Sequence, residues 1–311
     1  PVPPDALMAE PYDWELSRRA VPSVTDLVLI YGGGHHRTPY EWDRERLSDY
    51  VTYTDPDGRT QWLFDGFLFL EFKDGSGRNY TVGYEKLNAR RTEWEWLLDR
   101  IFEQGKSLSA LDRCIGQEIK ELGKPAFRHQ IVLGLPEAIR GQKDWGEIDG
   151  REMDFSKEED QIAATKWYIG ELVERFKAAK YKHLELSGFY WVAEDTHHCA
   201  ELTIPLSEYI HSEGKLFYWI PYWQAKGHEE WKRLGFDVAY QQPNHFFNHS
   251  IPDSRLDEAC ATARRHGMAM EFEFDEKATA AIPNSSHDRM AAYINHFEKN
   301  DVFNSSAVAY Y

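Results

Sequence analysis

The chain has 311 residues and a formal net charge of −16, from 52 acidic and 36 basic residues. This length suffices to bury a large core as one α/β barrel. A nucleic-acid surface needs a basic field that replaces phosphate counterions, and no cluster of Lys and Arg supplies one. We therefore expect no nucleic-acid partner. No run of about 18 apolar residues occurs, so we also expect no membrane insertion. Nothing in the sequence indicates an oligomeric state.

The N-terminal residues Pro1 to Pro4 lack the basic and apolar regions of a secretion signal. We interpret the chain as a mature protein from which a signal has been removed, and we expect a secreted, periplasmic or cell-surface location. Cys114, Cys199 and Cys260 are too few and too scattered for a disulfide framework or a zinc site. The sequence thus predicts neither a metal nor a cofactor.

Aromatic residues make up 14% of the chain, with 11 Trp, 17 Tyr and 17 Phe. Trp and Tyr gather at the ends of predicted strands, beside polar residues. Sugars offer apolar C–H faces that stack on flat rings, while their hydroxyls need polar partners at the edges. This composition favours a carbohydrate-binding pocket.

Apolar, β-branched or aromatic runs alternate with helical periods along the chain. The first four predicted strands cover 26–33, 62–72, 128–135 and 183–192, and helices are predicted over 41–51, 83–104, 156–179 and 201–212. The third of these helices opens on Ser156-Lys-Glu-Glu, the pattern of a capping box. The other four strands cover 216–222, 237–242, 267–274 and 306–311, with a short helix near Glu229 and helices over 253–266 and 286–300.

Eight strands that alternate with helices form either a doubly wound sheet or a closed barrel. No strand is followed by the glycine-rich turn of a dinucleotide-binding fold. Polar and aromatic residues also gather at the C-terminal ends of the strands, where a barrel builds its active site. The sequence therefore predicts a single α/β domain, a (β/α)8 TIM barrel over 26–311, with 1–25 as an N-terminal extension packed on it. The chain ends on the eighth strand, so the final helix is missing, as in a domain cut from a longer protein.

The seventh predicted strand carries Glu271, Glu273 and Asp275 in alternation with apolar residues. Side chains of a strand alternate between its two faces, so the apolar set should pack on the outer helices and the acids should point into the barrel. Carboxylates in a low-dielectric interior are costly unless they are paired or used. We expect Glu273 to lie nearer the barrel mouth than Glu271.

Glu194 ends the fourth predicted strand and should face Glu273 across the mouth. Glycoside cleavage needs two carboxyl groups on opposite sides of one bond, one that donates a proton and one that attacks or activates water. We assign Glu194 as the acid/base and Glu273 as the nucleophile, with Glu271 as a structural neighbour that contributes to the substrate site. An alternative places Glu194 on a loop, where Asp195 and Thr196 cap the next turn.

Further candidates for substrate contacts lie at or near strand ends. They are Tyr31, His35, Asp65, Tyr190, Trp191, Tyr222, Trp223, Gln241 and Asn244. The polar run that closes the sixth strand also includes Gln242 and His245, and amide side chains suit sugar hydroxyls because they both donate and accept hydrogen bonds. For Asp65, an ion pair within the barrel is an equally good interpretation.

Four of these segments together resemble a known family: Leu-Ile-Tyr-Gly-Gly, Phe-Asp-Gly-Phe, Gly-Phe-Tyr-Trp with Glu194, and Glu-Phe-Glu-Phe-Asp. It is an uncharacterised-domain family from polysaccharide-degrading gut and soil bacteria, grouped with TIM-barrel glycoside hydrolases, and the resemblance runs from Asp26 to Tyr311. Glutamates that end strands four and seven are the hallmark of the large retaining clan of such barrels. The resemblance implies a bacterial retaining glycosidase with Glu194 as acid/base and Glu273 as nucleophile. Ala193 stands where many clan members have Asn.

Two other functions remain open at this point. A non-catalytic glycan-binding barrel would share the aromatic residues without needing both acids. A metal-dependent sugar isomerase or deacetylase would need ligands assembled from distant residues, because the adjacent histidines of His35-His36 and His197-His198 point apart in an extended segment. No H-x-H, H-E-x-x-H or G-x-S-x-G motif occurs.

Overall fold

The computed structural model describes residues 24–32 and 41–311. Eight parallel strands close into a barrel, so the predicted TIM-barrel fold is confirmed. In chain order they are β1 (Asp26–Tyr31), β4 (Gly66–Leu70), β7 (His129–Leu135), β10 (Leu184–Trp191), β11 (Leu216–Trp219), β12 (Val238–Gln241), β13 (Ala269–Phe272) and β14 (Val308–Tyr310). The barrel closes where β14 pairs with β1, with Asp26 opposite Val308.

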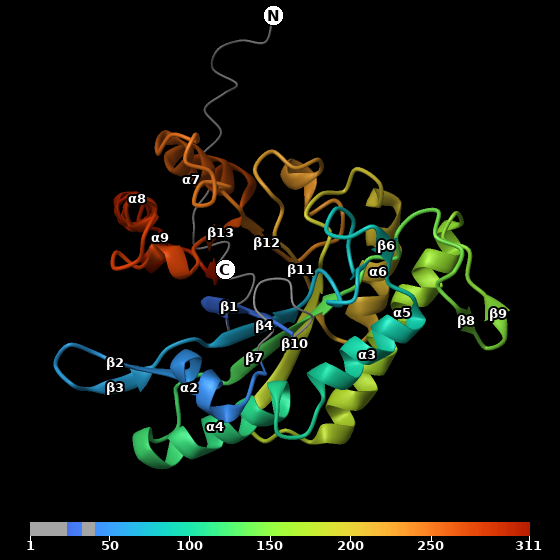
Figure 1. Cartoon of the computed structure of the whole chain (residues 1–311), viewed down its shortest axis with the longest axis horizontal. Helices are drawn as coiled ribbons and strands as arrows, with labels where there is room; N and C mark the ends of the chain where they lie inside the picture. Colours follow the sequence, from blue (N-terminus) through green and yellow to red (C-terminus); the bar gives the residue numbers. More distant parts are fainter. Residues whose placement is uncertain (1–23, 33–40) are drawn as a thin grey trace, which may run out of the picture.

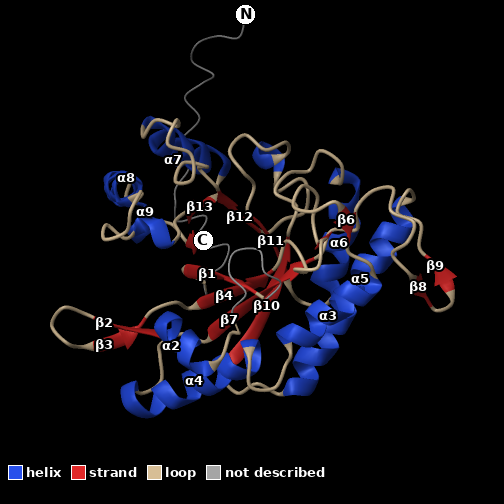
Figure 2. Cartoon of the chain, viewed as in Figure 1, coloured by secondary structure: helices blue, strands red, loops and turns tan. Residues whose placement is uncertain are grey.

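Helices surround the barrel (Figure 2). They are α2 (Arg44–Val51), α3 (Arg91–Ile101), α4 (Ser107–Leu122), α5 (Glu158–Ala179), α6 (Ala200–Ser212), α7 (Ser254–His266), α8 (His287–Lys299) and α9 (Val302–Ser305), with short 3-10 turns η2 (His228–Glu230) and η3 (Glu276–Ala278). In Figure 1, α7 to α9 lie on the side of β12 and β13, and α3 to α5 lie on the side of β7 and β10. Among the described residues, no helix is long and apolar enough to cross a bilayer.

Three small two-stranded sheets lie in the connections between barrel strands. They pair β2 (Thr52–Thr54) with β3 (Thr60–Trp62), β5 (Arg78–Asn79) with β6 (Leu87–Asn88), and β8 (Glu147–Ile148) with β9 (Arg151–Glu152). The β5–β6 connection follows the C-terminal end of β4, so its residues can reach the barrel mouth, where TIM barrels carry their sites.

The two faces of the barrel strands pack into two separate cores. Phe69 and Leu133 belong to the apolar layer between barrel and helices. Their neighbours Leu68 and Val132, together with Tyr218, fill the barrel interior. This alternation is the physical basis for predicting which side chains reach the site, because only inward-facing residues can line the barrel mouth.

Two sequence predictions about helices are wrong in detail. The stretch 83–104 is not one helix: α3 begins only at Arg91, and a second helix, α4, follows Gly105, whose φ of 89° requires a residue without a Cβ. Ser156 does not cap α5. Its hydroxyl binds Asp154 at 2.6 Å, and Lys157 occupies the N-cap position. The Ser156 hydroxyl therefore takes part in a local turn with Asp154, and the predicted capping box does not form.

Gly188 lies at an irregularity of β10, where the register with β7 shifts between Leu186 and Gly188. A Cβ at this position would lie 2.0 Å from the carbonyl oxygen of Leu216 on the next strand. We expect Gly188→Ala to lower the free energy of unfolding by about 3 kcal/mol, because β10 and β11 would have to separate. Urea denaturation measures this change.

Gly170→Ala in α5 is the matched control for this substitution. A Cβ there meets nothing nearer than the Tyr209 hydroxyl at 3.7 Å. Alanine should be neutral or stabilise by about 0.5–1 kcal/mol, because it is the better helix former. Similar changes in the free energy of unfolding for the two variants would contradict the close approach of β10 and β11 at Gly188.

Candidate active site

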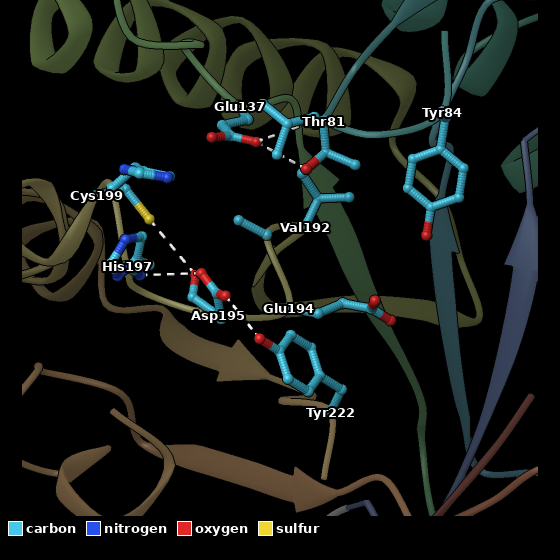
Figure 3. A pocket seen from close by; sticks show the side chains of 12 residues that line it. Thr81, Tyr84, Glu137, Val192, Glu194, Asp195, His197, Cys199 and Tyr222 are labelled. Atoms are coloured by element: carbon cyan, nitrogen blue, oxygen red, sulfur yellow. Dashed lines mark hydrogen bonds between the residues drawn. The ribbon is translucent and has the colours of Figure 1, made fainter. Parts of the chain in front are cut away.

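Two cavities at the C-terminal end of the barrel share Glu194 and Tyr84. The first, called here the Glu273 cavity, has a volume of about 300 Å³ and is lined by Phe72, Tyr84, Glu194, Gln242, Asn244, Phe247, Glu273 and Tyr311. The second, the Glu137 cavity, has a volume of about 290 Å³. It is lined by Thr81, Val82, Tyr84, Glu137, Val192, Ala193, Glu194, Asp195, His197, His198, Cys199 and Tyr222 (Figure 3). Glu194 thus lies between two spaces that a single ligand could occupy.

Glu273 follows β13, and its carboxyl is held by two donors. The backbone N–H of His245 donates to Oε2 at 3.1 Å, and the hydroxyl of Tyr293, on α8, donates to the same oxygen. The side chain is fully buried and lines the Glu273 cavity. Hydrogen bonds from two donors stabilise negative charge on a carboxyl group and fix its position.

His245, which donates to Glu273, is itself fixed by side chains from α8 and the loop before α7. Its Nε2 lies 2.8 Å from Oδ1 of Asp253, and Arg289 donates to its carbonyl oxygen at 2.6 Å. Arg289 also contacts Asp253 at 3.2 Å. Burial lowers the pKa of His245, against the opposing effect of Asp253. This network orients the loop after β12 beneath Glu273.

Glu194 follows β10 in a different electrostatic setting. Burial is the largest cause that raises the pKa of Glu194 to about 7, and the negative charge of Glu273 is the second. A hydrogen bond from Gln242 acts in the opposite direction. Close to neutral pH, Glu194 therefore exists as a mixture of the protonated and ionised forms, as a residue that both gives and takes a proton requires.

Glu271 lies deeper in the barrel, on the same face of β13 as Glu273. It is 1% exposed, and its Oε2 has no hydrogen-bond partner among the described residues. Burial, followed by the charges of Glu273 and Glu194, raises the pKa of Glu271 well above its ordinary value. Tyr190 is also buried here, and burial together with the charges of Glu194 and Glu271 raises the pKa of its hydroxyl. The site thus contains three mutually repelling carboxyls.

At pH 8, Glu271→Gln is expected to increase the free energy of unfolding by about 2 kcal/mol relative to wild type. The pKa of Glu271 in the folded protein lies above its value of 4.5 in the unfolded chain. Between the two pKa values the folded state binds more protons, so stability is lost as the pH rises. Glutamine has no proton to lose, and the difference should therefore shrink towards pH 5.

Urea denaturation of both proteins at pH 5 and pH 8 measures this effect. Glu185→Gln is the control, since Glu185 lies on β10 with a side chain that is 53% exposed beside Arg128. Exposed ion pairs contribute little to stability. If Glu271→Gln increased the free energy of unfolding by the same amount at both pH values, the charge of Glu271 would not be what destabilises the wild-type protein.

Several residues predicted from the sequence lie together at the cavities. Glu194, Glu273 and Asn244 line the Glu273 cavity, and Tyr222 lines the Glu137 cavity, where its hydroxyl donates to Asp195 at 2.8 Å. Tyr31 is the last residue of β1. Its ring contacts the rings of Phe72 and Tyr311 at centroid distances of 5.8 and 5.7 Å, and both of these residues line the Glu273 cavity. His35 lies outside the described residues.

The structure corrects the predicted placement of Trp191 and Gln241, because side chains alternate between the two faces of a strand. Trp191 packs in the outer core between barrel and helices, whereas its neighbour Tyr190 fills the interior. Tyr240 likewise faces inward, which turns Gln241 outward and brings Gln242 to the cavity instead. Adjacent residues of a strand cannot both face the barrel interior.

Asp65, Trp223 and Asp275 also lie elsewhere than predicted. Asp65 precedes β4, at the N-terminal end of the barrel, and accepts hydrogen bonds from the backbone and hydroxyl of Thr25. Trp223 lines neither cavity; its ring packs under the guanidinium of Arg255 at 4.7 Å. Asp275 accepts from the N–H of Lys277 and caps η3, because β13 ends at Phe272 and the alternation does not continue.

The sequence reasoning missed Glu137 and the aromatic wall of the Glu273 cavity. Glu137 follows β7 by two residues, so the rule that selected Glu194 could also have found it. Tyr84 lies in the β5–β6 connection and Phe247 in the loop after β12, where no periodic signal points to the mouth. The described residues contain no group of three or more His, Cys, Asp and Glu side chains arranged to hold a metal ion.

Solved structures with similar folds include enzymes of different kinds. A protein from Bacteroides thetaiotaomicron VPI-5482, provisionally assigned as an alpha-L-fucosidase, is 14% identical, with a TM-score of 0.48 over 93% of this chain and 85% of that one. PbGH5A, a glycoside hydrolase family 5 enzyme from Prevotella bryantii B14, is 14% identical, with a TM-score of 0.45 over 97% and 92%. The carboxyl transferase domain of Rhizobium etli pyruvate carboxylase is 9% identical, with a TM-score of 0.44 over 96% and 42%.

At such identities these likenesses do not bear on activity. No curated protein matches the chain in sequence. One family model does match, over residues 26–311, and it covers every strand of the barrel. The chain therefore belongs to the DUF4855 family, a domain of unknown function.

Proposed function

We propose that this protein is a retaining glycoside hydrolase that cleaves a poly- or oligosaccharide, with Glu194 as acid/base and Glu273 as nucleophile. One observation carries the proposal: both carboxyls line one cavity at the barrel mouth, yet their surroundings differ. Burial and the charge of Glu273 raise the pKa of Glu194 to about 7, whereas two donors hold Glu273. Carboxyl pairs with such unequal surroundings divide acid and nucleophile roles between them.

The reaction would proceed in two displacements. Protonated Glu194 gives its proton to the glycosidic oxygen while an oxygen of Glu273 attacks the anomeric carbon and forms a glycosyl–enzyme ester. The leaving group departs with that proton. Ionised Glu194 then removes a proton from water, which attacks the same carbon and releases Glu273. Each displacement inverts the anomeric carbon, so the product retains its configuration.

The other walls of the Glu273 cavity suit a sugar ring. Aromatic side chains supply flat surfaces for its C–H faces, and these are Phe72, Tyr84, Phe247 and Tyr311. Gln242 and Asn244 supply amide groups for the hydroxyls. Phe247 is 43% exposed, which places an aromatic ring at the rim, where an incoming glycan would make first contact. A polysaccharide substrate fits a secreted or cell-surface enzyme.

A screen of the purified protein against plant, host and microbial glycans tests the proposal. Proton NMR of the first product formed reports its anomeric configuration. Retention supports Glu273 as nucleophile, and inversion contradicts it. Binding of a glycan without turnover would favour a non-catalytic glycan-binding barrel. Turnover that disappears on dialysis against a chelator and returns with metal would favour the metal-dependent alternative.

Tyr293→Phe is expected to lower kcat by about 10- to 100-fold and to leave KM nearly unchanged. The substitution removes the hydroxyl that donates to Oε2 of Glu273. A hydrogen bond to a charged group is worth about 1.5–3 kcal/mol, which corresponds to this range of rates. Steady-state kinetics on the best substrate from the screen measure it.

Tyr168→Phe serves as the matched control. Tyr168 is also a buried helical tyrosine, on α5, and its hydroxyl has no hydrogen-bond partner among the described residues. Loss of that hydroxyl should leave kcat unchanged. A fall in kcat shared by both variants would indicate a general packing defect, and Tyr293 would then have no positioning role.

A further inference from the structure

The Glu137 cavity is separated from the nucleophile by Glu194. Glu194 lines both cavities, whereas Glu273 lines only one of them. An acid that protonates a glycosidic oxygen must lie beside the bond that joins the two halves of the substrate. Under the proposed function, the half that Glu273 attacks would occupy the Glu273 cavity, and the other half would extend past Glu194 towards the Glu137 cavity.

Carboxyl groups dominate the wall of the Glu137 cavity. Glu137, Glu194 and Asp195 line it, and no Lys or Arg side chain is among its lining residues. His197 and His198 lie at one side, and the ammonium group of Lys226 approaches the Nδ1 of His197 at 3.5 Å. This balance of charge disfavours an anionic sugar, since like charges at close range repel.

Glu137 presents a carboxyl oxygen that the protein leaves without a donor. The side chain is 7% exposed, and its Oε2 accepts from the hydroxyl of Thr81 at 2.7 Å and from the N–H of Val82 at 3.2 Å. No described residue donates to Oε1, and Figure 3 shows both bonds reaching one oxygen while the other turns away from Thr81. Oε1 is not fully buried, so water or a ligand can donate a hydrogen bond to it.

Asp195 and Tyr222 complete the opposite side of this cavity. Oδ2 of Asp195 accepts from the hydroxyl of Tyr222 at 2.8 Å, and Oδ1 accepts from the N–H of His197 at 2.9 Å. Tyr222 is 37% exposed, so its ring can pack on one face of a sugar, and Figure 3 shows its hydroxyl pointing to Asp195. With a volume of about 290 Å³, the cavity is at the lower limit of small-molecule sites, which suits a single sugar unit.

We propose that the Glu137 cavity is the leaving-group subsite and that it selects a sugar unit with a free amino group, whose ammonium ion binds Glu137 and Asp195. The leaving-group assignment rests on the proposed function; the ammonium site rests on the cavity alone. An ammonium ion donates charge-assisted hydrogen bonds, about twice as strong as those of a hydroxyl. Its positive charge also compensates the negative charge of the carboxyl groups. Without such a ligand, burial disfavours the ionised form of Glu137 and raises its pKa.

Binding of monosaccharides to the wild-type protein tests the site without any hydrolysis. Glucosamine, glucose and glucuronate have no glycosidic bond to cleave, and ligand-observed NMR titration measures their weak affinities. We expect glucosamine to bind about tenfold more tightly than glucose, and glucuronate not to bind. Equal affinities for glucosamine and glucose would overturn the proposal.

Two variants locate the bound amine. Glu137→Gln should weaken glucosamine binding about tenfold and leave glucose binding unchanged, whereas Glu185→Gln, which lies outside both cavities, should affect neither. Glucosamine binding that is as tight in Glu137→Gln as in the wild-type protein would refute the assignment. Asp195→Asn is the second variant if Glu137→Gln does not fold, as judged by thermal unfolding.

The outcome is separable from that of the glycan screen. Selective amine binding that depends on Glu137, in a protein that hydrolyses no glycan, would refute the glycosidase assignment and leave the ammonium site standing. Turnover of neutral glycans without any preference for a free amine would refute the ammonium site and leave the glycosidase assignment standing.

Discussion

Glu273→Gln is expected to lower kcat/KM by about 10⁴-fold or more while sugar binding persists. Glutamine has nearly the same shape as glutamate but cannot form the glycosyl ester. The positions of Tyr293 and His245 should change little, because an amide oxygen can accept their hydrogen bonds in place of the carboxylate. Removal of the charge also relieves the repulsion that Glu194 and Glu271 experience.

Glu185→Gln is the control for this loss, because Glu185 also belongs to the barrel but its side chain is 53% exposed on the surface. It should retain full turnover. Wild-type turnover in Glu273→Gln, with sugar binding intact, would rule out Glu273 as the nucleophile. A protein that neither binds nor turns over sugar would be checked for folding by its urea transition before any conclusion about chemistry.

Azide distinguishes the role of Glu273 from that of Glu194. In Glu273→Ala, azide can occupy the space of the lost carboxyl and attack once, which yields a glycosyl azide of inverted configuration. In Glu194→Ala, the ester on Glu273 still forms from a substrate with a good leaving group, and azide then replaces water, which yields the retained configuration. The opposite pairing of variant and product would exchange the two assignments.

The second large effect concerns Glu194→Gln and the pH profile. In the wild-type protein, kcat/KM should fall as the pH rises above about 7, because Glu194, the proposed acid, then loses its proton. Glu194→Gln should lower kcat/KM by about 10²–10⁴-fold for alkyl leaving groups and remove this basic limb. Dinitrophenyl glycosides need little protonation, so their first step should change much less.

Gln242 allows the position of that basic limb to be shifted. Its hydrogen bond lowers the pKa of Glu194, against the effects of burial and Glu273. Gln242→Leu should therefore raise the pKa of Glu194 and move the basic limb to higher pH. The profile of Glu185→Gln should match that of wild type. A basic limb that is still present in Glu194→Gln would show that another group supplies the proton.

The strand alternation of β13 predicted the placement of its two glutamates correctly, because alternation is a local property of an extended chain. Glu271 and Glu273 share the inward face, and Met270 and Phe272 pack against the helices. In β10 the same alternation separates Tyr190 from Trp191. Only Tyr190 faces the barrel interior, and Trp191 packs against the helices, so the two adjacent residues cannot both contribute to the site.

The sequence by itself determined the eight strands, their alternation with helices and the two acids that follow β10 and β13, since each depends on periodicity over a few neighbours. Only the tertiary structure decided the chemistry of those acids. Tyr293 reaches Glu273 from α8, and Gln242 reaches Glu194 from the end of β12. The pKa of each carboxyl depends on burial, hydrogen bonds and repulsion, which come from residues far apart in the chain. Local sequence patterns do not predict such contacts.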